Sequence, residues 1–228
     1  MRAALSAADV KAFLARHGLL ARRDLGQNFL VDESLAERLV ALSGVEPGDC
    51  VIEVGTGLGV LTRALAKKAQ RVVTIEIDAG IVRALRADAA LPDNVELVHA
   101  DALEFDLEEC VRDRTGAARL VANLPYNASA PLLRRCLDLR NQLTSWSVML
   151  QAEVAKRLLA QPGSRDYGSL SVLHGLMVVL SKAMQLSSNC FFPVPKVEST
   201  FVRVTPLAAP AIEEGEFPGV EQFVRAAF

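Results

Sequence analysis

The sequence predicts an α/β fold built on a doubly wound sheet of mainly parallel strands. Three observations carry this prediction. Short apolar strands alternate with amphipathic helices from residue 51 onward, a glycine-rich turn follows the first of these strands, and acidic or polar residues stand where the strands end. Alternation at this spacing implies right-handed crossovers, which place helices on both faces of a parallel sheet. At 228 residues, the chain is long enough to bury such a core.

Two helices are expected before the alternation begins. Ser6 and Asp9 form a capping-box pattern at the start of the first helix. A polar, turn-like segment follows at 22–30, and a second helix is expected from Asp32 to Gly44.

The alternating region supplies the sheet and its helices. Parallel strands are expected at 51–54, 72–77, 95–98, 120–122 and 146–150. The helices between them begin near residues 60, 78, 129 and 153. Ser129 is the expected N-cap of its helix, and Arg135 is expected on the outer side of that helix. Later strands at 178–186 and 199–204, joined by a proline-rich loop, are expected to add an antiparallel hairpin at the sheet edge, before a last helical start at 220–228.

Composition excludes several classes of protein. With 51% hydrophobic and 23% charged residues, the chain is neither disordered nor collagen-like. Its apolar runs are far shorter than the roughly 20 residues of a membrane span, and Asp9 and Lys11 interrupt any signal-peptide core. The four cysteines and three histidines lack the spacing of zinc ligands, so no metal is expected. These features predict a soluble, cytoplasmic chain, whose formal charge of −2 gives no sign of a nucleic-acid partner.

A glycine-rich loop, Gly55-Thr56-Gly57-Leu58-Gly59, lies between the first parallel strand and its helix. Glycines let the backbone turn sharply and let a ligand approach closely. The spacing is GxGxG, whereas dinucleotide-binding folds carry GxGxxG, and an NAD-dependent oxidoreductase is therefore disfavoured. A loop of this kind can also be a plain strand–helix turn.

Three carboxylates surround this loop in the predicted fold. Glu53 precedes it, and Glu76 ends the next strand at the offset of about 20 residues where a carboxylate takes ribose hydroxyls. Asp101 follows the third strand, where it could accept a hydrogen bond from an adenine amino group. Carboxylates repel phosphates but suit a ligand with ribose, adenine and a positive centre. The sequence therefore predicts S-adenosylmethionine, although each acid alone could be a solvated strand end.

Asn123-Leu124-Pro125-Tyr126 follows the fourth strand, at the end of the sheet where ligands bind. The exocyclic amine of an aromatic base is a poor nucleophile, because its lone pair is delocalised into the ring. Acceptors for both amino protons restore that lone pair, and the Asn123 side-chain oxygen and the Leu124 carbonyl can supply them. Pro125 stiffens the loop, and Tyr126 offers a face on which the base can stack. An ordinary turn is the alternative.

The loop between the two late strands carries Phe191, Phe192 and Lys196 beside two prolines. Such a loop could form a platform for the second face of a flipped base. Both phenylalanines could instead be buried in the core; we expect one ring in the core and one in the pocket.

Four segments in this order resemble the ribosomal RNA adenine dimethyltransferases, in particular the bacterial branch that dimethylates two adjacent adenosines near the 3′ end of small-subunit rRNA. These segments are 24–30, 53–59, 123–126 and 191–197, and the resemblance runs from about Phe13 to the C-terminus. It implies a class I S-adenosylmethionine-dependent methyltransferase fold and a role in ribosome biogenesis. The implied partner of the chain, expected to be a monomer, is small-subunit rRNA or the pre-assembled small subunit.

The resemblance also implies roles for individual residues. The expected cofactor-binding residues are Gln27, Asn28, Leu30, Gly55, Gly57, Gly59, Glu76, Ile77, Asp101, Ala102 and Asn123. The expected catalytic residues are Asn123, Leu124, Pro125 and Tyr126. The expected substrate-binding residues are Tyr126, Phe191, Phe192 and Lys196.

The expected organisation has three parts. Residues 1–45 form N-terminal helices and a cofactor-covering segment, 46–206 form the methyltransferase domain, and 207–228 begin a C-terminal helical domain that is truncated here. Two alternatives remain: an antibiotic-resistance type of enzyme acting on large-subunit rRNA, and a non-catalytic RNA-binding relative. The amino-acid sequences of segments 123–126 and 191–197 favour the small-subunit enzyme. The presence of both Asn123 and Tyr126 favours a catalytic protein over a non-catalytic relative.

Overall fold

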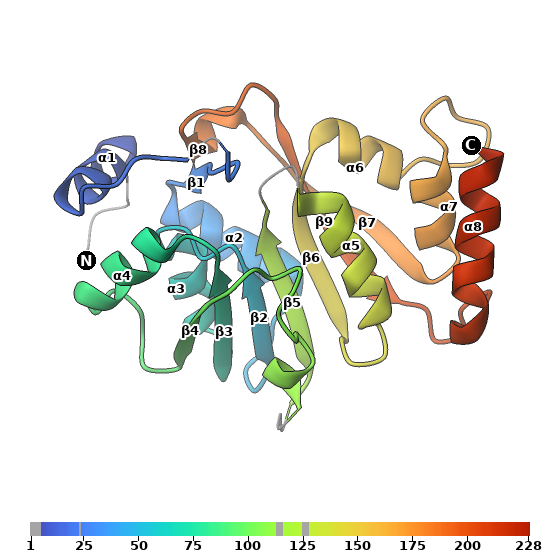
Figure 1. The fold of residues 1–228 in the computed structure, drawn as a ribbon, viewed down its shortest axis with the longest axis horizontal. Helices are drawn as coiled ribbons and strands as arrows, with labels where there is room; N and C mark the ends of the chain where they lie inside the picture. Colours follow the sequence, from blue (N-terminus) through green and yellow to red (C-terminus); the bar gives the residue numbers. More distant parts are fainter. Residues whose placement is uncertain (1–5, 23, 113–115, 125–127) are drawn as a thin grey trace.

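The computed structural model describes residues 6–22, 24–112, 116–124 and 128–228 (Figure 1). Within these residues the main sheet has seven strands, in the order β4-β3-β2-β5-β6-β9-β7. The strands are β2 (Cys50–Val54), β3 (Arg71–Glu76), β4 (Val95–His99), β5 (Ala118–Asn123), β6 (Ser145–Gln151), β7 (Val178–Leu186) and β9 (Ser199–Pro206). β2 to β6 pair in parallel, and the strand order reverses between β2 and β5, where such sheets open a ligand crevice.

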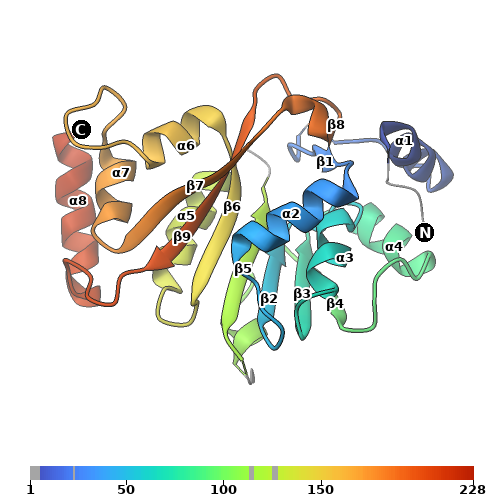
Figure 2. The same ribbon diagram turned by 180° about the vertical axis from the view of Figure 1, so that it is seen from behind.

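The helices cover both faces of this sheet. They are α1 (Ala7–Arg16), α2 (Glu33–Ser43), α3 (Val60–Ala66), α4 (Ala79–Ala87), α5 (Ser129–Asp138), α6 (Ala152–Leu158), α7 (Ser169–Gly175) and α8 (Phe217–Ala227). α5, α7 and α8 pack on the face that carries Ile52, Leu120 and Trp146. α2 and α3 pack on the opposite face, as Figure 2 shows from behind. The predicted doubly wound α/β class is therefore confirmed.

The late hairpin is present, with its second strand inside the sheet. β9 pairs antiparallel with both β6 and β7, so β7 is the edge strand. Side-chain burial explains this order, since Phe201, Val202 and Val204 of β9 are fully buried. β7 leaves Val179 half exposed, as an edge strand with one free side can.

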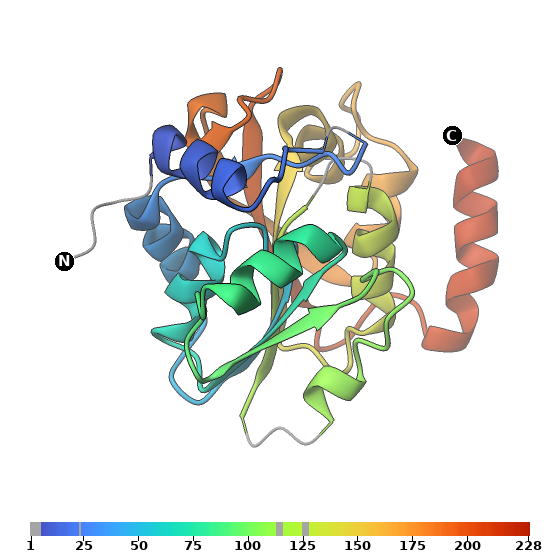
Figure 3. The ribbon, with the colours of Figure 1, turned by 60° about the vertical axis from the view of Figure 1, so that its left-hand side comes forward.

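A second, smaller sheet was not expected from the sequence. It pairs β1 (Phe29–Leu30) antiparallel with β8 (Phe191–Phe192). In Figure 3 α1 and the chain that follows it cross the carboxyl end of the main sheet. The N-terminal segment and the loop between the late strands are thus joined through backbone hydrogen bonds above the crevice.

Helix starts follow the predicted capping chemistry, with one exception. Ser6 and Asp9 form the expected capping box on α1, and the Asp32 side chain caps α2. Ser129 was expected to cap α5 but is its first helical residue, and its hydroxyl has no partner among the described residues. α7 was missed, because its apolar residues run directly into those of β7. No helix among the described residues has the length and apolar composition needed to cross a membrane.

Candidate functional site

A cleft opens at the carboxyl ends of β2, β3 and β5 and holds about 960 Å³ of space, its open mouth included. One wall is residues 25–30, called the cover segment below, and the opposite wall is the glycine loop at 55–58. The ends of β2, β3, β4 and β5 supply most of the remaining lining residues, and α3 and α5 supply the others.

Most of the predicted cofactor residues line this cleft. They are Gln27, Asn28, Leu30, Gly55, Gly57, Glu76, Ile77, Asp101, Ala102 and Asn123, and the predicted catalytic Leu124 lines it as well. Gly59 is not among the lining residues. Pro125 and Tyr126, two of the predicted catalytic residues, lie outside the described residues.

Gly55 and Gly57 bring the glycine loop close to two other parts of the site. Its φ of +87° is a conformation that favours glycine, and a Cβ there would lie 2.8 Å from the backbone oxygen of Asn123. A Cβ at Gly57 would lie 3.2 Å from the Phe29 ring of the cover segment. The glycines therefore allow the loop to pack against both the end of β5 and the cover segment.

Gly59 has a structural role instead. It is the N-cap of α3 with a φ of +74°, and a Cβ there would lie 2.8 Å from the Leu91 side chain. The GxGxG pattern thus combines two glycines in the cleft wall with one that starts a helix.

Glu76 presents a fixed carboxylate to the cleft. The backbone N–H of Asp78 donates to its Oε1 at 3.0 Å, and the backbone N–H of Gly57 donates to its Oε2 at 2.9 Å. Burial raises the pKa of this carboxyl, and the same two hydrogen bonds oppose the rise. Each oxygen keeps a further lone pair, which suits it to accept from ligand hydroxyls.

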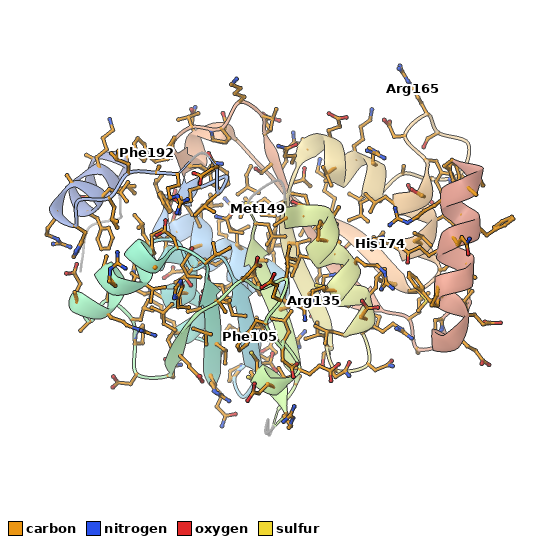
Figure 4. The ribbon with its side chains drawn as sticks, viewed as in Figure 1. Phe105, Arg135, Met149, Arg165, His174 and Phe192 are labelled. Atoms are coloured by element: carbon orange, nitrogen blue, oxygen red, sulfur yellow. The ribbon has the colours of Figure 1, made fainter. Side chains whose placement is uncertain are left out.

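Asp101 lies in the turn after β4, and an arginine supports this turn. Asp101 Oδ1 accepts from the backbone N–H of Leu103 at 2.8 Å. Arg135 of α5 donates to the carbonyls of Ala102 at 2.6 Å and Phe105 at 2.9 Å. Figure 4 labels Arg135 and Phe105. Arg135 was expected on the outer side of its helix, and no local sequence pattern reveals its contact with a turn about 30 residues away.

Glu53 does not face the cleft, which corrects the expectation of three carboxylates around the glycine loop. Its side chain is fully buried beneath the loop, and its Oε2 accepts from the hydroxyls of Thr62 and Thr74, each at 2.6 Å. Burial raises the pKa of Glu53 to about 8. Glu53 is thus a neutral, structural acid below that pH.

Among the described lining residues, Glu76 and Asp101 are the only charged ones. The described part of the lining thus contains two acids and no lysine or arginine, so it suits a ligand with hydroxyls and a positive centre better than one with phosphates. The residues present therefore fit the predicted S-adenosylmethionine.

Asn123 is oriented by the cover segment. Its Nδ2 donates to the backbone oxygen of Asn28 at 3.4 Å, and the side chain of Asn28 in turn donates to the carbonyl of Gly26 at 3.0 Å. This orientation leaves Asn123 Oδ1 as the atom that can accept from a substrate amine.

The predicted substrate-binding phenylalanines are not among the described residues that line the cleft. Phe191 is 3% exposed and packs in the core near α2 and β9. Phe192 is partly buried beside α1, with Lys11 Nζ 5.3 Å from its ring centre, and Figure 4 shows it at this end of the molecule. Lys196 is exposed on the loop that follows. Of the two rings, Phe192 is thus the more accessible.

Comparison with known proteins shows the family to which the chain belongs. The family model for ribosomal RNA adenine dimethylase matches residues 18–228. The ribosomal RNA small subunit methyltransferase A of Geobacter sulfurreducens is 40% identical over 212 residues, 92% of this chain and 77% of the relative. The protein of the same name from Magnetococcus marinus is 39% identical over 219 residues, 96% of this chain and 78% of the relative.

Solved structures give the same result. A dimethyladenosine transferase from Plasmodium falciparum superposes with a TM-score of 0.73 at 26% identity, covering 84% of this chain and 67% of that one. The 23S rRNA methyltransferase ErmE superposes with a TM-score of 0.70 at 27% identity, covering 87% of this chain and 78% of that one. The predicted fold and enzyme class, an S-adenosylmethionine-dependent adenine methyltransferase of ribosomal RNA, are confirmed. The chain belongs to the ribosomal RNA adenine dimethylase family.

Proposed function

We propose that this chain methylates the 6-amino groups of two adjacent adenosines near the 3′ end of small-subunit rRNA, giving the dimethylated base at each. The observation that carries the proposal is the placement of Asn123 and Leu124 at the end of β5, in the wall of a cleft with two acids. Two relatives at about 40% identity, both named as small-subunit enzymes, support this target over the large subunit, because ErmE is 27% identical.

The site residues fall into a cofactor side and an acceptor side. When bound, S-adenosylmethionine supplies an electrophilic methyl group on a sulfonium. Glu76 would accept hydrogen bonds from its ribose hydroxyls, and Asp101 would accept one from its adenine amine. Their negative charge complements the sulfonium.

On the acceptor side, Asn123 Oδ1 and the Leu124 carbonyl accept from the two protons of the target amine. This restores the lone pair of the nitrogen and aligns it with the methyl group, so alignment and charge complementarity supply most of the catalysis. No base is needed before the transfer, because the amine becomes acidic only when the new N–C bond forms and the C–S bond breaks. The proton then leaves to solvent.

The second face of the target base needs an aromatic partner. Tyr126, Phe191 and Phe192 are the aromatic residues that the resemblance assigns to substrate binding, and Phe192 shares the loop with Phe191. Because Phe191 is 3% exposed, we propose that Phe192 is the ring that meets the RNA. We further propose that the chain acts in the cytoplasm as a monomer of 24.6 kDa, which light scattering can check.

Methyl transfer to isolated subunits tests the proposal. The chain should transfer tritiated methyl groups from S-adenosylmethionine to undermethylated small subunits, and mass spectrometry should locate dimethyladenosine at two adjacent positions. Large subunits are the control. Methylation of large subunits alone would replace the proposed target with the large-subunit alternative.

Asn123→Ala tests the acceptor chemistry. Removing the side-chain oxygen should lower methyl transfer by at least about 100-fold, the size seen when a transition-state hydrogen-bond partner is lost. Binding of S-adenosylhomocysteine, measured by calorimetry, should fall only modestly, since Glu76 and Asp101 remain. Normal turnover by this variant would show that Asn123 does not activate the amine.

A further inference from the structure

The β1–β8 pairing holds the end of the cover segment at Phe29 and Leu30, and one side chain of the segment, Gln27, uses all of its polar atoms within the protein. Gln27 Oε1 accepts from the backbone N–H of Arg22 at 2.8 Å, and Gln27 Nε2 donates to Asp78 Oδ2 at 2.9 Å. The Gln27 backbone N–H donates to the Arg22 carbonyl at 3.1 Å. Gln27 therefore closes its own turn and ties that turn to the start of α4.

Asp78 connects this contact to the cofactor side of the cleft. Its Oδ1 accepts from the backbone N–H groups of Gly80 at 2.8 Å and Ile81 at 3.3 Å, which caps α4. Its own backbone N–H donates to Glu76 Oε1. One residue, 8% exposed, thus joins the cover segment, the helix start and the carboxylate that faces the cleft.

We propose that Gln27 and Asp78 form a latch that closes the cover segment over the cleft and slows release of the bound cofactor. Both are positioning residues in this role: Gln27 lines the cleft, but its side-chain amide is already engaged on both atoms. The identity of the ligand rests on the proposed function, whereas the latch itself does not. The closed cover segment also places the Asn28 carbonyl that orients Asn123, so latch and acceptor geometry are linked.

Three variants break and rebuild the latch. Gln27→Glu sets a carboxylate against that of Asp78 and removes the donor. Asp78→Asn keeps the cap of α4 through its amide oxygen, but its Nδ2 then faces Gln27 Nε2, so two donors meet. Turning the Gln27 amide does not help, because its Nε2 would then face the Arg22 N–H.

The double variant restores every side-chain hydrogen bond of the latch, and only the bond between residues 27 and 78 has its direction exchanged. The introduced asparagine caps α4 with its oxygen and donates to the introduced glutamate, whose other oxygen accepts from Arg22. Recovery in the double variant would show that the hydrogen bond between positions 27 and 78 is what matters. If the wild-type residues were needed for another reason, the double variant would not recover. Gln161→Glu, which adds the same charge at an exposed position between α6 and α7, is the matched control.

The first readout is hydrogen exchange of the ligand-free chain. Both single variants should speed exchange in residues 24–30 by about 10-fold or more, the effect of losing a hydrogen bond to a charged group. The double variant should return to within about 3-fold of the original rate. The amides of Gly80 and Ile81 should stay protected in Asp78→Asn, which shows that α4 is still capped.

The second readout is the dissociation rate of S-adenosylhomocysteine, which should rise about 10-fold in each single variant and recover in the double. The latch would be overturned if hydrogen exchange at 24–30 were unchanged in the single variants. It would also be overturned if hydrogen exchange or ligand dissociation in the double variant were as fast as in the single variants. If exchange behaves as expected but the chain binds no S-adenosylhomocysteine, the latch stands and the proposed cofactor role of the cleft fails.

Discussion

Glu53, Glu76 and Asp101 stand at or near the ends of neighbouring strands, yet each has a different environment. Asp101 lies partly exposed in the turn after β4, and Glu76 is held by two backbone N–H groups in the cleft wall. Glu53 lies beneath the loop, where two threonine hydroxyls serve one oxygen and the other has no partner among the described residues. Burial therefore divides them into two cleft acids and one structural acid.

Glu53 makes stability depend on pH. Its pKa in the folded chain is raised from 4.5 to about 8 by burial. The stabilisation from the neutral carboxyl is fully present below pH 4.5 and is lost as pH rises through about 8. Glu53→Gln cannot ionise at this position. From pH 5 to pH 8, the free energy of unfolding of this variant should therefore rise relative to that of the wild type by on the order of 1 kcal/mol per pH unit.

Urea unfolding at several pH values measures this difference. Glu104→Gln, at an exposed position, is the control and should follow the wild-type slope. Parallel slopes for Glu53→Gln and the wild type would mean that Glu53 is already ionised in the folded chain.

At the scale of elements, α5 supports two different neighbours with adjacent arginines. Arg135 holds the turn that carries Asp101, through the carbonyls of Ala102 and Phe105. Arg134 faces α8, where it contacts Glu221 at 3.4 Å and lies 4.3 Å from the centre of the Phe217 ring. One helix thus links the cofactor side of the cleft to the C-terminal helix.

These two arginines give a matched pair of variants. Arg135→Ala should free the turn and weaken S-adenosylhomocysteine binding roughly 5- to 10-fold, since two hydrogen bonds that fix the Asp101 turn are lost. Arg134→Ala should lower the thermal midpoint by a few degrees and leave the affinity unchanged. Calorimetry measures the affinity of both variants for S-adenosylhomocysteine, and thermal unfolding measures their stability. Equal affinities in the two variants would show that Arg135 does not support the binding site.

The sequence predicts those elements whose signal is local. The five parallel strands and the capped starts of α1, α2 and α4 come from apolar runs and capping residues that stand close together in the chain. β1 and β8 have two residues each, too few for any periodicity. They form because the cover segment and the late loop meet in the folded chain.

The same limit applies to the site. The glycine loop, Glu76, Asp101 and Asn123 could be placed because strand ends in a parallel sheet meet at one edge. The partners that hold them could not: Gln27 and Asp78 are 51 residues apart, and Arg135 is 33 residues from Ala102. Such pairs depend on how α4 and α5 pack, which no local pattern encodes.

At the scale of the whole molecule, the cleft joins the N-terminal segment, the sheet and the turns after β3 and β4. A ligand that binds there only in the folded state stabilises all of these parts together. At about 100 times its dissociation constant such a ligand adds roughly 2.7 kcal/mol, which for a chain of this length raises the thermal midpoint by roughly 5–10 °C. S-adenosylhomocysteine should produce a shift of this size.

The two cleft acids make the shift selective. NAD at the same concentration should give almost none, because its pyrophosphate would approach Glu76 and Asp101 with no lysine or arginine among the described lining residues to offset the charge. Glu76→Ala should lose most of the shift with S-adenosylhomocysteine while unfolding as cooperatively as the wild type. A full shift in Glu76→Ala would remove this carboxylate from ribose recognition, and a shift with NAD would contradict the charge argument for the cleft.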